Sequence, residues 1–335
     1  MYWMTKMKQS VVSTYSLKNK SRAQVMEKCF RYFDKFEDGM EVKVLIKPNL
    51  CRAMASETGA TTDTTLVEDV IKHLHTRGIT NISIVESDTH HRNAEEVFDR
   101  NGYRDLEEKY DITCINLSKD ETFTMEANNL PRKLRIPKSL ILCDYFISMA
   151  KLKTHAEEKI SCVLKNQFGC LPSRIKSVYH PYMSTTLTEL NRIIKPDVCL
   201  IDGIVGMEGL GPTKGTPKKT DLIICGNDPV ATDSVAAKIM GFDPYSVPHL
   251  QFAARNRLGN IDNIKLLGDN IAPIPFSFIP NDVYRLYRLE FQFEKVGQKI
   301  HNKFSRLSQI SRRIGDLVRE GGWSYVFTRF WNKIR

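Results

Sequence analysis

The chain has 335 residues, of which 41% are hydrophobic and 26% are charged, and its formal net charge is +10. This composition is typical of a globular protein and excludes collagen-like, repetitive and wholly disordered chains. The sequence has no run of about 18 apolar residues and does not start with the charged-then-apolar pattern of a signal peptide. We therefore expect a cytoplasmic protein, with a peripheral position at a membrane left open.

Positive charge is concentrated at the two ends of the chain. Residues 1–20 carry four lysines and no acid, and residues 281–335 carry 12 basic against five acidic residues. The 260 residues between them carry 33 basic and 34 acidic residues, so they are nearly neutral. Because the body lacks a basic field that could bind duplex phosphates, nucleic acid is not an expected partner.

Short apolar runs rich in β-branched residues alternate with helical patterns. The strand candidates are residues 42–46, 82–86, 112–115, 145–149, 198–201 and 222–225. Such alternation predicts an α/β protein with a parallel-sheet, doubly wound Rossmann-like core. A division of this core into two lobes, residues 41–150 and 151–272, is left open.

Two helices have clear start and stop signals. The first carries an apolar stripe within residues 66–74, and Thr65 with Glu68 forms a candidate capping box at its start. The second has Asp228 as its expected N-cap and Gly241 as its stop. The first helix is predicted to lie between the first two strands of the α/β core, and the second follows the last strand candidate.

The domain prediction has three parts. Residues 1–40 form an N-terminal segment, residues 41–272 the α/β domain, and residues 273–335 a linker followed by a basic amphipathic helical tail. Aromatic residues are interleaved with cations in the last part, which suits an anionic membrane surface, a groove of a protein partner or, less well, single-stranded nucleic acid. The alternative is a basic helix that packs its apolar stripe on the body.

The eight cysteines are scattered and lack the close Cys-x-x-Cys pairs of zinc ribbons and of most iron–sulfur loops. Several of them lie inside apolar runs, which indicates reduced core residues. An iron–sulfur cluster is therefore not expected from their spacing. The cysteines are Cys29, Cys51, Cys114, Cys143, Cys162, Cys170, Cys199 and Cys225.

Polar side chains follow several predicted strands at their carboxyl ends, where open parallel sheets bind ligands. We expect these side chains to form one site for a small carboxylate or phosphate, and the alternative is that chains simply turn polar at strand ends. The catalytic candidates are His155, Lys153, Lys165 and Asp202. The substrate-binding candidates are Lys47, Asn49, Asp88, Lys151, Asn166, His180 and Lys214.

The roles within this group follow from side-chain chemistry. His155 is expected to be a base or a hydrogen-bonding group, because neighbouring lysines lower the pKa of an imidazole and keep it neutral. Asp88 and Asp202 are expected to position lysines or to bind a divalent metal. Lys165 has a structural alternative, in which it caps helix carbonyls.

One segment and one carboxylate are less specific. Residues 201–215 contain five glycines but match neither the phosphate loop nor the dinucleotide fingerprint. We interpret them as a mobile loop over the site, with a plain surface turn as the alternative. Asp233, inside the second helix, is interpreted as a solvated helix residue.

Several motifs taken together resemble the family catalogued as domain of unknown function 362, over about residues 40 to 260. The resemblance implies an α/β domain, which other members fuse to an iron–sulfur segment of the ferredoxin type; this sequence shows no such segment. A fainter similarity, in architecture and in the placing of Lys and His, links the pattern to lactate-racemase-like proteins. The motifs are Lys47-Pro48-Asn49-Leu50, Lys151-x-Lys153-Thr154-His155, Leu164-Lys165-Asn166, Phe168-Gly169, Asp202-Gly203, Glu208-Gly209, Gly211-Pro212 and Asp228-Pro229-Val230-Ala231-x-Asp233.

Three functions remain open on this basis. The leading hypothesis is an enzyme, an oxidoreductase or an isomerase, that binds a small anionic substrate and uses His155 as its proton-transfer group. The second is an iron–sulfur-associated redox accessory protein, and the third is a non-catalytic anion-binding adaptor that docks to a membrane surface through residues 281–335. The sequence does not identify the cofactor: a divalent metal is left open, and an iron–sulfur cluster is not expected from the cysteine spacing.

Overall fold

The computed structural model describes residues 9–33, 41–90, 92–127 and 130–279. The chain divides into two compact units, residues 1–278 and 279–335, and the fold below is that of the first. The predicted basic tail lies outside the described residues. The boundaries of the three predicted domains stay predictions.

The first unit is built on a large mixed sheet. Its path of neighbouring strands is β11 (Ile264–Gly268), β1 (Ser10–Ser16), β10 (Thr216–Gly226), β9 (Val198–Glu208), β7 (Tyr145–His155), β2 (Val44–Pro48), β3 (Ile82–Glu86) and β4 (Thr113–Asn116), with β8 (Lys159–Ser161) added on β7. A separate hairpin joins β5 (Thr122–Met125) and β6 (Leu134–Pro137).

The strand order defines where a ligand site belongs. From β9 to β4 all neighbours are parallel. If these five parallel strands are numbered by their order in the chain, they lie in the order 3-2-1-4-5 from β4 to β9. The chain therefore adds strands in one direction from β2 to β4 and in the other direction from β7 to β9, and the switch lies between β2 and β7. Ligands of doubly wound sheets bind beyond the carboxyl ends of the strands at this switch point. The fold therefore points to the ends of β2 and β7.

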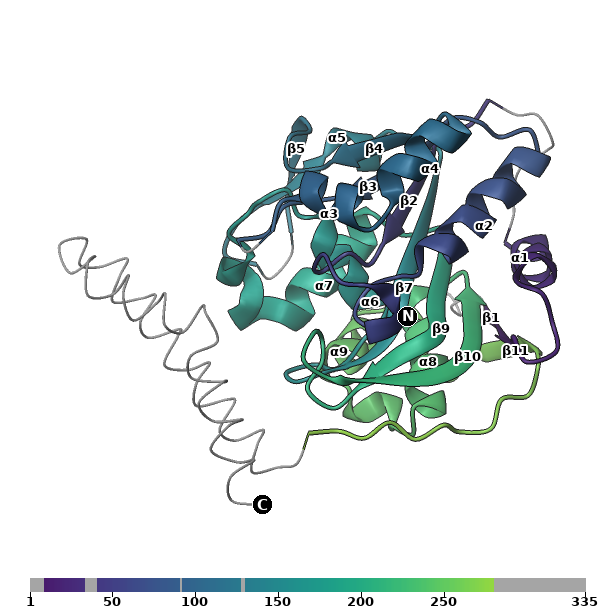
Figure 1. Ribbon diagram of the computed structural model, residues 1–335. Helices are drawn as coiled ribbons and strands as arrows, with labels where there is room; N and C mark the ends of the chain where they lie inside the picture. The colour runs from purple at the N-terminus through teal and green to yellow at the C-terminus, as the bar shows by residue number, and fades with distance from the viewer. Residues whose placement is uncertain (1–8, 34–40, 91, 128–129, 280–335) are drawn as a thin grey trace, which may run out of the picture. The chain divides into compact units, whose positions relative to one another are not determined.

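Helices cover both faces of the sheet (Figure 1). One layer holds α1 (Arg22–Arg31), α2 (Thr64–Thr76), α3 (Ala94–Arg100) and α4 (Tyr103–Tyr110). The other layer holds α6 (Val163–Asn166), α7 (Met183–Ile193), α8 (Pro229–Ile239) and α9 (Pro248–Arg255). Shorter helical turns are α5 (Lys138–Ile141), η1 (Ser56–Thr58), η2 (Gln167–Cys170), η3 (Lys176–Tyr182) and η4 (Pro244–Ser246).

Strand alternation divides the core between the two layers. In β2, Val44 and Ile46 pack with the apolar stripe of α2, whereas Leu45 packs in a cluster on the opposite face. Because successive side chains of a strand point to opposite faces, a strand covered on both sides reads as a continuous apolar run. The predicted α/β fold with a mostly parallel sheet is confirmed.

The two predicted helices are present, and their starts differ in detail. The prediction for α8 is confirmed, because the side chain of Asp228 accepts hydrogen bonds from Val230 N and Ala231 N. The capping box at Thr65 and Glu68 is wrong: Asp63 is the N-cap of α2 and accepts from Thr65 N at 2.8 Å. Asp63 is the better cap since its carboxylate also binds the Thr65 hydroxyl at 2.6 Å.

Two predicted strands are much longer than expected. β7 continues through His155 and β9 through Glu208, so residues 201–208 form a strand and the glycine-rich loop shrinks to residues 209–215. The prediction of a mobile loop over residues 201–215 is therefore wrong for residues 201–208. The extension is stable because β10 pairs antiparallel along β9 and β8 pairs with the end of β7.

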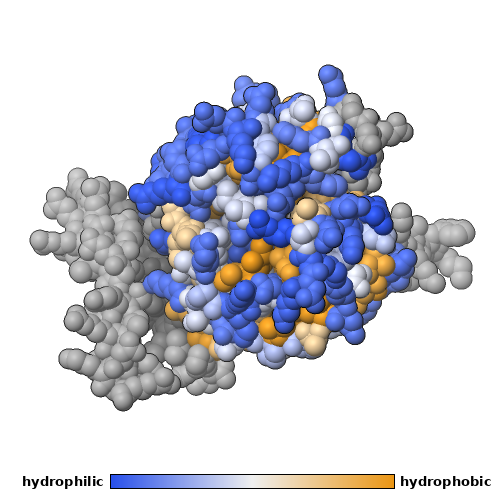
Figure 2. Space-filling model, turned by 45° about the vertical axis from the view of Figure 1, so that its right-hand side comes forward, coloured by the Kyte–Doolittle hydropathy of each residue, from blue (hydrophilic) through white to orange (hydrophobic). Residues whose placement is uncertain are grey.

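Figure 2 shows one face on which hydrophilic residues dominate the upper half, while apolar residues gather in the lower half. Among the helices that the structure describes, none combines the length and the apolar character needed to cross a bilayer.

Candidate functional site

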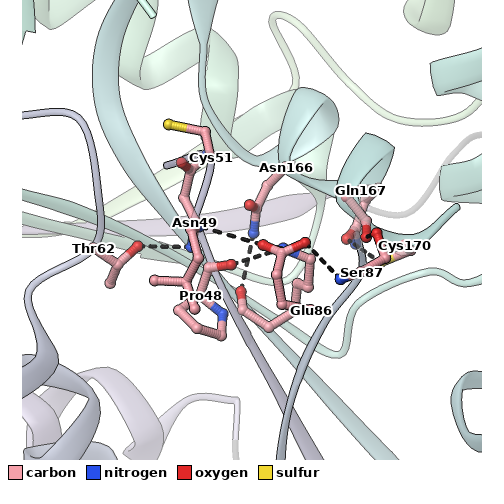
Figure 3. A network of polar contacts seen from close by, with 12 residues as sticks. Pro48, Asn49, Cys51, Thr62, Glu86, Ser87, Asn166, Gln167 and Cys170 are labelled. Carbon is pink, nitrogen blue, oxygen red and sulfur yellow. Dashed lines mark hydrogen bonds and ion pairs between the residues drawn. The ribbon is translucent and has the colours of Figure 1, made fainter. Parts of the chain in front are cut away.

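Polar side chains from several elements meet at the carboxyl ends of β2 and β7, at the switch point of the sheet. Figure 3 shows Pro48 at the end of β2 and Asn49 directly after it, Glu86 at the end of β3, and Asn166 reaching down from α6. Asn166 Nδ2 donates to the carbonyl oxygen of Lys47 and to Ser148 Oγ, both at 3.0 Å, and so joins α6 to β2 and β7. Because Asn166 is buried and fully engaged there, it holds the elements together.

Lys47 forms a buried ion pair with Glu86. The Lys47 Nζ to Glu86 Oε2 distance is 2.7 Å, and Arg92 contacts the other carboxylate oxygen at 3.2 Å. Burial would raise the pKa of Glu86, but the charges of Lys47, Arg92 and Lys176 outweigh burial and lower the pKa to about 2. The charge of Lys47 is thus neutralised by a carboxylate of the protein itself. The sequence had instead predicted that Lys47 binds a substrate.

Lys151 and Asp202 form a second buried pair, from adjacent positions on β7 and β9. Lys151 Nζ donates to Asp202 Oδ2 at 2.8 Å. The same carboxylate accepts from Asp63 N at 2.8 Å and from Ile204 N at 2.9 Å. The expectation that Asp202 positions a lysine agrees with this geometry, and the carboxylate is occupied by these three donors.

Lys153 is buried like the other two lysines but has different partners. Its ammonium group donates to Ala60 O at 2.7 Å, to Asn49 Oδ1 at 3.0 Å and to Cys51 Sγ at 3.4 Å. In the part of the chain that the structure describes, Lys153 forms no ion pair with a carboxylate. Burial lowers its pKa, and the neighbouring charge of Lys151 adds to that effect.

His155 ends β7 with its ring in a defined orientation. Its Nδ1 accepts from the backbone N–H groups of Glu157 at 3.2 Å and Glu158 at 3.3 Å. Burial and the positive charges of Lys165 and Lys153 hold the pKa of His155 well below 6.5. The ring is therefore neutral, and two donors on Nδ1 assign the proton to Nε2.

Lys165 is the third residue of the four-residue helix α6 and is half-buried. Burial lowers its pKa, and the charges of Glu158 and Glu157 partly oppose this. Its Nζ lies 5.5 Å from the ring centroid of Phe168, whose ring lies 5.9 Å from that of His180. Lys165 and His180 both act on the pKa of His155, so the structure brings these three predicted residues together.

An open cavity of about 240 Å³ adjoins this group. Its wall includes the first turn of α7, which continues directly from η3, where Met183 N–H donates to His180 O. Glu158 faces the cavity and binds His249 Nδ1 at 2.9 Å. The lining residues are Glu158, His180, Pro181, Tyr182, Met183, Ser184 and Thr185.

Sequence reasoning missed a second cationic cluster around Ser87. Lys176 is buried in η3, and its Nζ donates to Ser87 Oγ at 2.5 Å. Burial lowers the pKa of Lys176 to about 7, in spite of the charge of Glu86. No motif marks Lys176, since the chain brings it to β3 only through the turns after α6.

Three other predicted residues have different surroundings. Asp88 Oδ1 accepts from Ala94 N at 2.9 Å and Asn116 Nδ2 at 3.0 Å, so Glu86 rather than Asp88 holds a lysine. Lys214 is exposed on the loop of residues 209–215. Asp233 is fully buried and accepts from the N–H groups of Val163 and Leu164, which corrects its interpretation as a solvated residue.

Metal-ligating side chains are dispersed. The eight cysteines are free thiols, six of them buried. Within residues 9–33, 41–90, 92–127 and 130–279, no three His, Cys, Asp or Glu side chains come together in a way that could hold a metal ion.

The chain is similar to two known proteins over part of its length. It is 31% identical over 170 residues to the thylakoid-associated protein sll1697 of Synechocystis sp., which covers 49% of this chain and 52% of that protein. The chain thus spans about half the length of this curated relative. A structural likeness to the lactate racemase apoprotein of Thermoanaerobacterium thermosaccharolyticum covers 60% of this chain and 51% of that chain, at 12% identity and a TM-score of 0.34.

A family model matches the region that contains the whole cluster of polar residues. Its description is "Domain of unknown function (DUF362)", and it matches residues 44–238, from the start of β2 to the end of α8. This range is more than half of the chain and includes the motifs at Lys47, Lys151, Lys165 and Asp202. The chain belongs to the family of domain of unknown function 362.

Proposed function

We propose that the protein is an enzyme that binds a small carboxylate or phosphate beside the end of β7. The observation that carries the proposal is the difference among the lysines. Lys47 and Lys151 each have a buried carboxylate within hydrogen-bonding distance, whereas Lys153 has neutral acceptors and a thiol. Buried cations without a carboxylate are stabilised by an anionic ligand.

Lys165 and His155 complete the proposed site. Lys165 carries a second cation close to Lys153, since the charge of each acts on the pKa of His155. The neutral His155 ring presents an Nε2–H group, which suits hydrogen bonding to a substrate oxygen on which charge develops. Its role in proton transfer is then to polarise or to donate, because the lone pair on Nδ1 is occupied by backbone donors.

Anion binding is tested by isothermal titration calorimetry with inorganic phosphate, lactate and oxalate. We expect at least one of them to bind with a millimolar or lower Kd and the Lys165→Met variant to bind it at least about tenfold more weakly, a loss of about 1.4 kcal/mol. Lys119→Met is the matched control, because Lys119 is exposed and pairs with Glu95. If the wild-type protein binds none of the three anions, the proposal is wrong.

A second candidate function is docking to an anionic membrane surface. Residues 281–335 combine 12 basic residues with interleaved aromatics, and the curated relative is named as thylakoid-associated. The candidate is tested by flotation with vesicles containing 30% phosphatidylserine, comparing the full chain with a chain that ends at Phe278. Flotation of the full chain alone supports it, and equal behaviour of the two chains contradicts it.

A further inference from the structure

Three buried cations surround one carboxylate at the end of β3. Glu86 contacts Lys47 at 2.7 Å and Arg92 at 3.2 Å, and the charge of Lys176 acts on it as well. Each of these four residues is at most 8% exposed. If all three cations are charged, two positive charges remain uncompensated in the interior, where an unpaired charge is costly.

Lys176 has the weakest support for a positive charge in this cluster. Among the described residues, its Nζ donates to one acceptor, the neutral Ser87 Oγ, at 2.5 Å. Lys47 Nζ donates instead to a carbonyl oxygen and to the carboxylate of Glu86. An ammonium group has three N–H donors, and buried donors are costly to leave unsatisfied. Burial lowers the pKa of Lys176 to about 7 against the charge of Glu86, so a neutral amine with a lone pair is a major form at neutral pH.

The surroundings of Lys176 favour one more negative charge. The side chains with the largest effects on its pKa are Glu86, Arg92, Lys47 and Cys170. Glu86 is the anion among these four, because burial raises the pKa of the Cys170 thiol to about 12. Arg174 and Asp88 carry opposite charges, with Nε and Oδ2 3.8 Å apart, and add no net charge. An anionic group on Lys176 would bring the cluster to two positive and two negative charges.

We propose that Lys176 is a site of reversible carbamate formation with carbon dioxide. The amine lone pair forms an N–C bond to carbon dioxide, one electron pair of a C=O bond moves onto oxygen, and the nitrogen loses a proton to solvent. One amine and one carbon dioxide thus give one carbamate anion and one proton, without an oxidant or a reductant. Lys47 and Arg92 compensate the charge of the carbamate. Acid reverses the step, because a protonated amine has no lone pair.

Carbon dioxide matches Lys176 in size and in charge. A residue that is 7% exposed admits a small reagent, and an uncharged one has little hydration to lose on entering. Lys153 is not expected to react, because its three acceptors engage all the donors of an ammonium group, so it keeps the charge that the proposed function requires. Lys165 is not expected to react either, since the negative charges of Glu158 and Glu157 would repel a carbamate.

The test is chemical trapping of carbamates in the full-length wild-type protein, equilibrated with carbon-13-labelled carbon dioxide and bicarbonate. Triethyloxonium tetrafluoroborate converts a carbamate into a stable ethyl ester, which peptide mass spectrometry assigns to a lysine. At pH 8.0 we expect at least about tenfold more labelled ester on Lys176 than on Lys119, because an ordinary lysine is almost wholly protonated there. Lys119 is the control, since it is exposed and pairs with Glu95. Label on Lys176 that does not exceed the label on Lys119, or that is equal at pH 6.0 and 8.0 under one pressure of carbon dioxide, overturns the proposal.

A stability measurement separates the carbamate from the proposed anion site. Since the carbamate forms preferentially in the folded chain, carbon dioxide with bicarbonate at pH 8.0 should raise the Tm of the wild type relative to chloride of equal ionic strength. The rise should be smaller in Lys176→Met, and an equal rise in both proteins contradicts the carbamate; if the variant does not fold, the labelling result decides. Lys165→Met should keep the label on Lys176. A labelled Lys176 in a protein that binds no phosphate, lactate or oxalate supports the carbamate and contradicts the proposed function alone.

Discussion

The charge state of His155 follows from contacts at a single ring atom. Glu157 N–H and Glu158 N–H both point at Nδ1, so a proton there would break two hydrogen bonds in addition to placing a cation beside Lys165 and Lys153. Burial and the positive charges of Lys165 and Lys153 hold the pKa of His155 well below 6.5, and the two N–H donors at Nδ1 also disfavour the imidazolium form. The neutral ring of His155 therefore offers a hydrogen-bond donor, its Nε2–H group.

Nitrogen-15 NMR of labelled protein tests this state. We expect the His155 ring to show a protonated Nε2 and an unprotonated Nδ1 throughout pH 6 to 8, with the signals assigned through the His155→Gln variant. The unfolded chain binds the proton near pH 6.5 and the folded chain only at lower pH, so His155 makes the protein less stable as the pH falls below 6.5. Titration of His155 with a midpoint at or above 6.5 would contradict the assignment.

Glu86 gives the fold an acid-sensitive ion-pair network. Its pKa is about 2 in the folded protein, against about 4.5 for an ordinary glutamate, because Lys47, Arg92 and Lys176 outweigh the effect of burial. The stabilisation, on the order of 3 kcal/mol, is fully present above pH 4.5 and is lost as the pH falls toward 2.

Urea unfolding of Glu86→Gln at several pH values measures this contribution. We expect the variant to be about 3 to 5 kcal/mol less stable than the wild type at pH 7, since it leaves buried cations unpaired, and the difference to shrink between pH 4.5 and 3. Glu27→Gln is the control, because Glu27 forms an exposed pair with Arg31 and should change stability by less than about 0.5 kcal/mol. A difference that is the same at pH 7 and pH 3 would show that Glu86 is not linked to acid unfolding.

Residue types and strand ends were enough to predict where the charges gather, but not which of them neutralise one another. Lys47, Lys151 and Lys153 look equivalent in the sequence, as cations after apolar runs. Their partners come from residues far away in the chain: Glu86 lies 39 positions from Lys47, and Asp202 lies 51 positions from Lys151. Such pairs depend on strand register, which a single sequence does not specify.

At the scale of elements, one side chain joins α8 to the edge of the sheet. Asp228 caps the helix through Val230 N and Ala231 N, and its other oxygen accepts from Ser10 Oγ at 2.5 Å and Asn260 N at 3.0 Å. The cap therefore links α8, β1 and the turn before β11. This explains why a strand from the start of the chain can pair with β10.

We expect Asp228→Ala to destabilise the protein by about 3 kcal/mol, because it removes a cap and leaves two buried donors unsatisfied. Asp243→Ala is the matched control, since Asp243 is an exposed cap whose side chain accepts from Tyr245 N, and it should cost about 1 kcal/mol or less. Both changes are measured by urea unfolding. Equal losses in the two variants would show that the links of Asp228 to Ser10 and Asn260 contribute nothing.

The elements themselves were predictable where local signals are strong. The strand at 82–86 is the same in the structure, and α8 begins directly after its predicted cap. Strand ends were not predictable, because β7 and β9 continue only while β8 and β10 supply backbone partners for them. β1 and the edge strand β11 were missed because their apolar patterns are weak.

At the scale of the molecule, the candidate site and the basic tail fall in different units. The site lies within residues 44–238, and the division between the units follows Phe278. Every contact used above to build the site joins residues of the first unit. Anion binding should therefore be a property of residues 1–278 alone, whatever residues 279–335 bind.

A chain that ends at Phe278 tests this separation. It lacks the 12 basic and five acidic residues of positions 281–335, which removes most of the net positive charge. We expect it to unfold in one cooperative transition with a Tm within a few degrees of that of the full chain, because its core clusters lie within the first unit. Its affinity for the anion that the full chain binds should agree within about twofold, a difference of about 0.4 kcal/mol. Calorimetry and titration of both chains measure these quantities, and a truncated chain that folds but loses the anion would show that the tail contributes to the site.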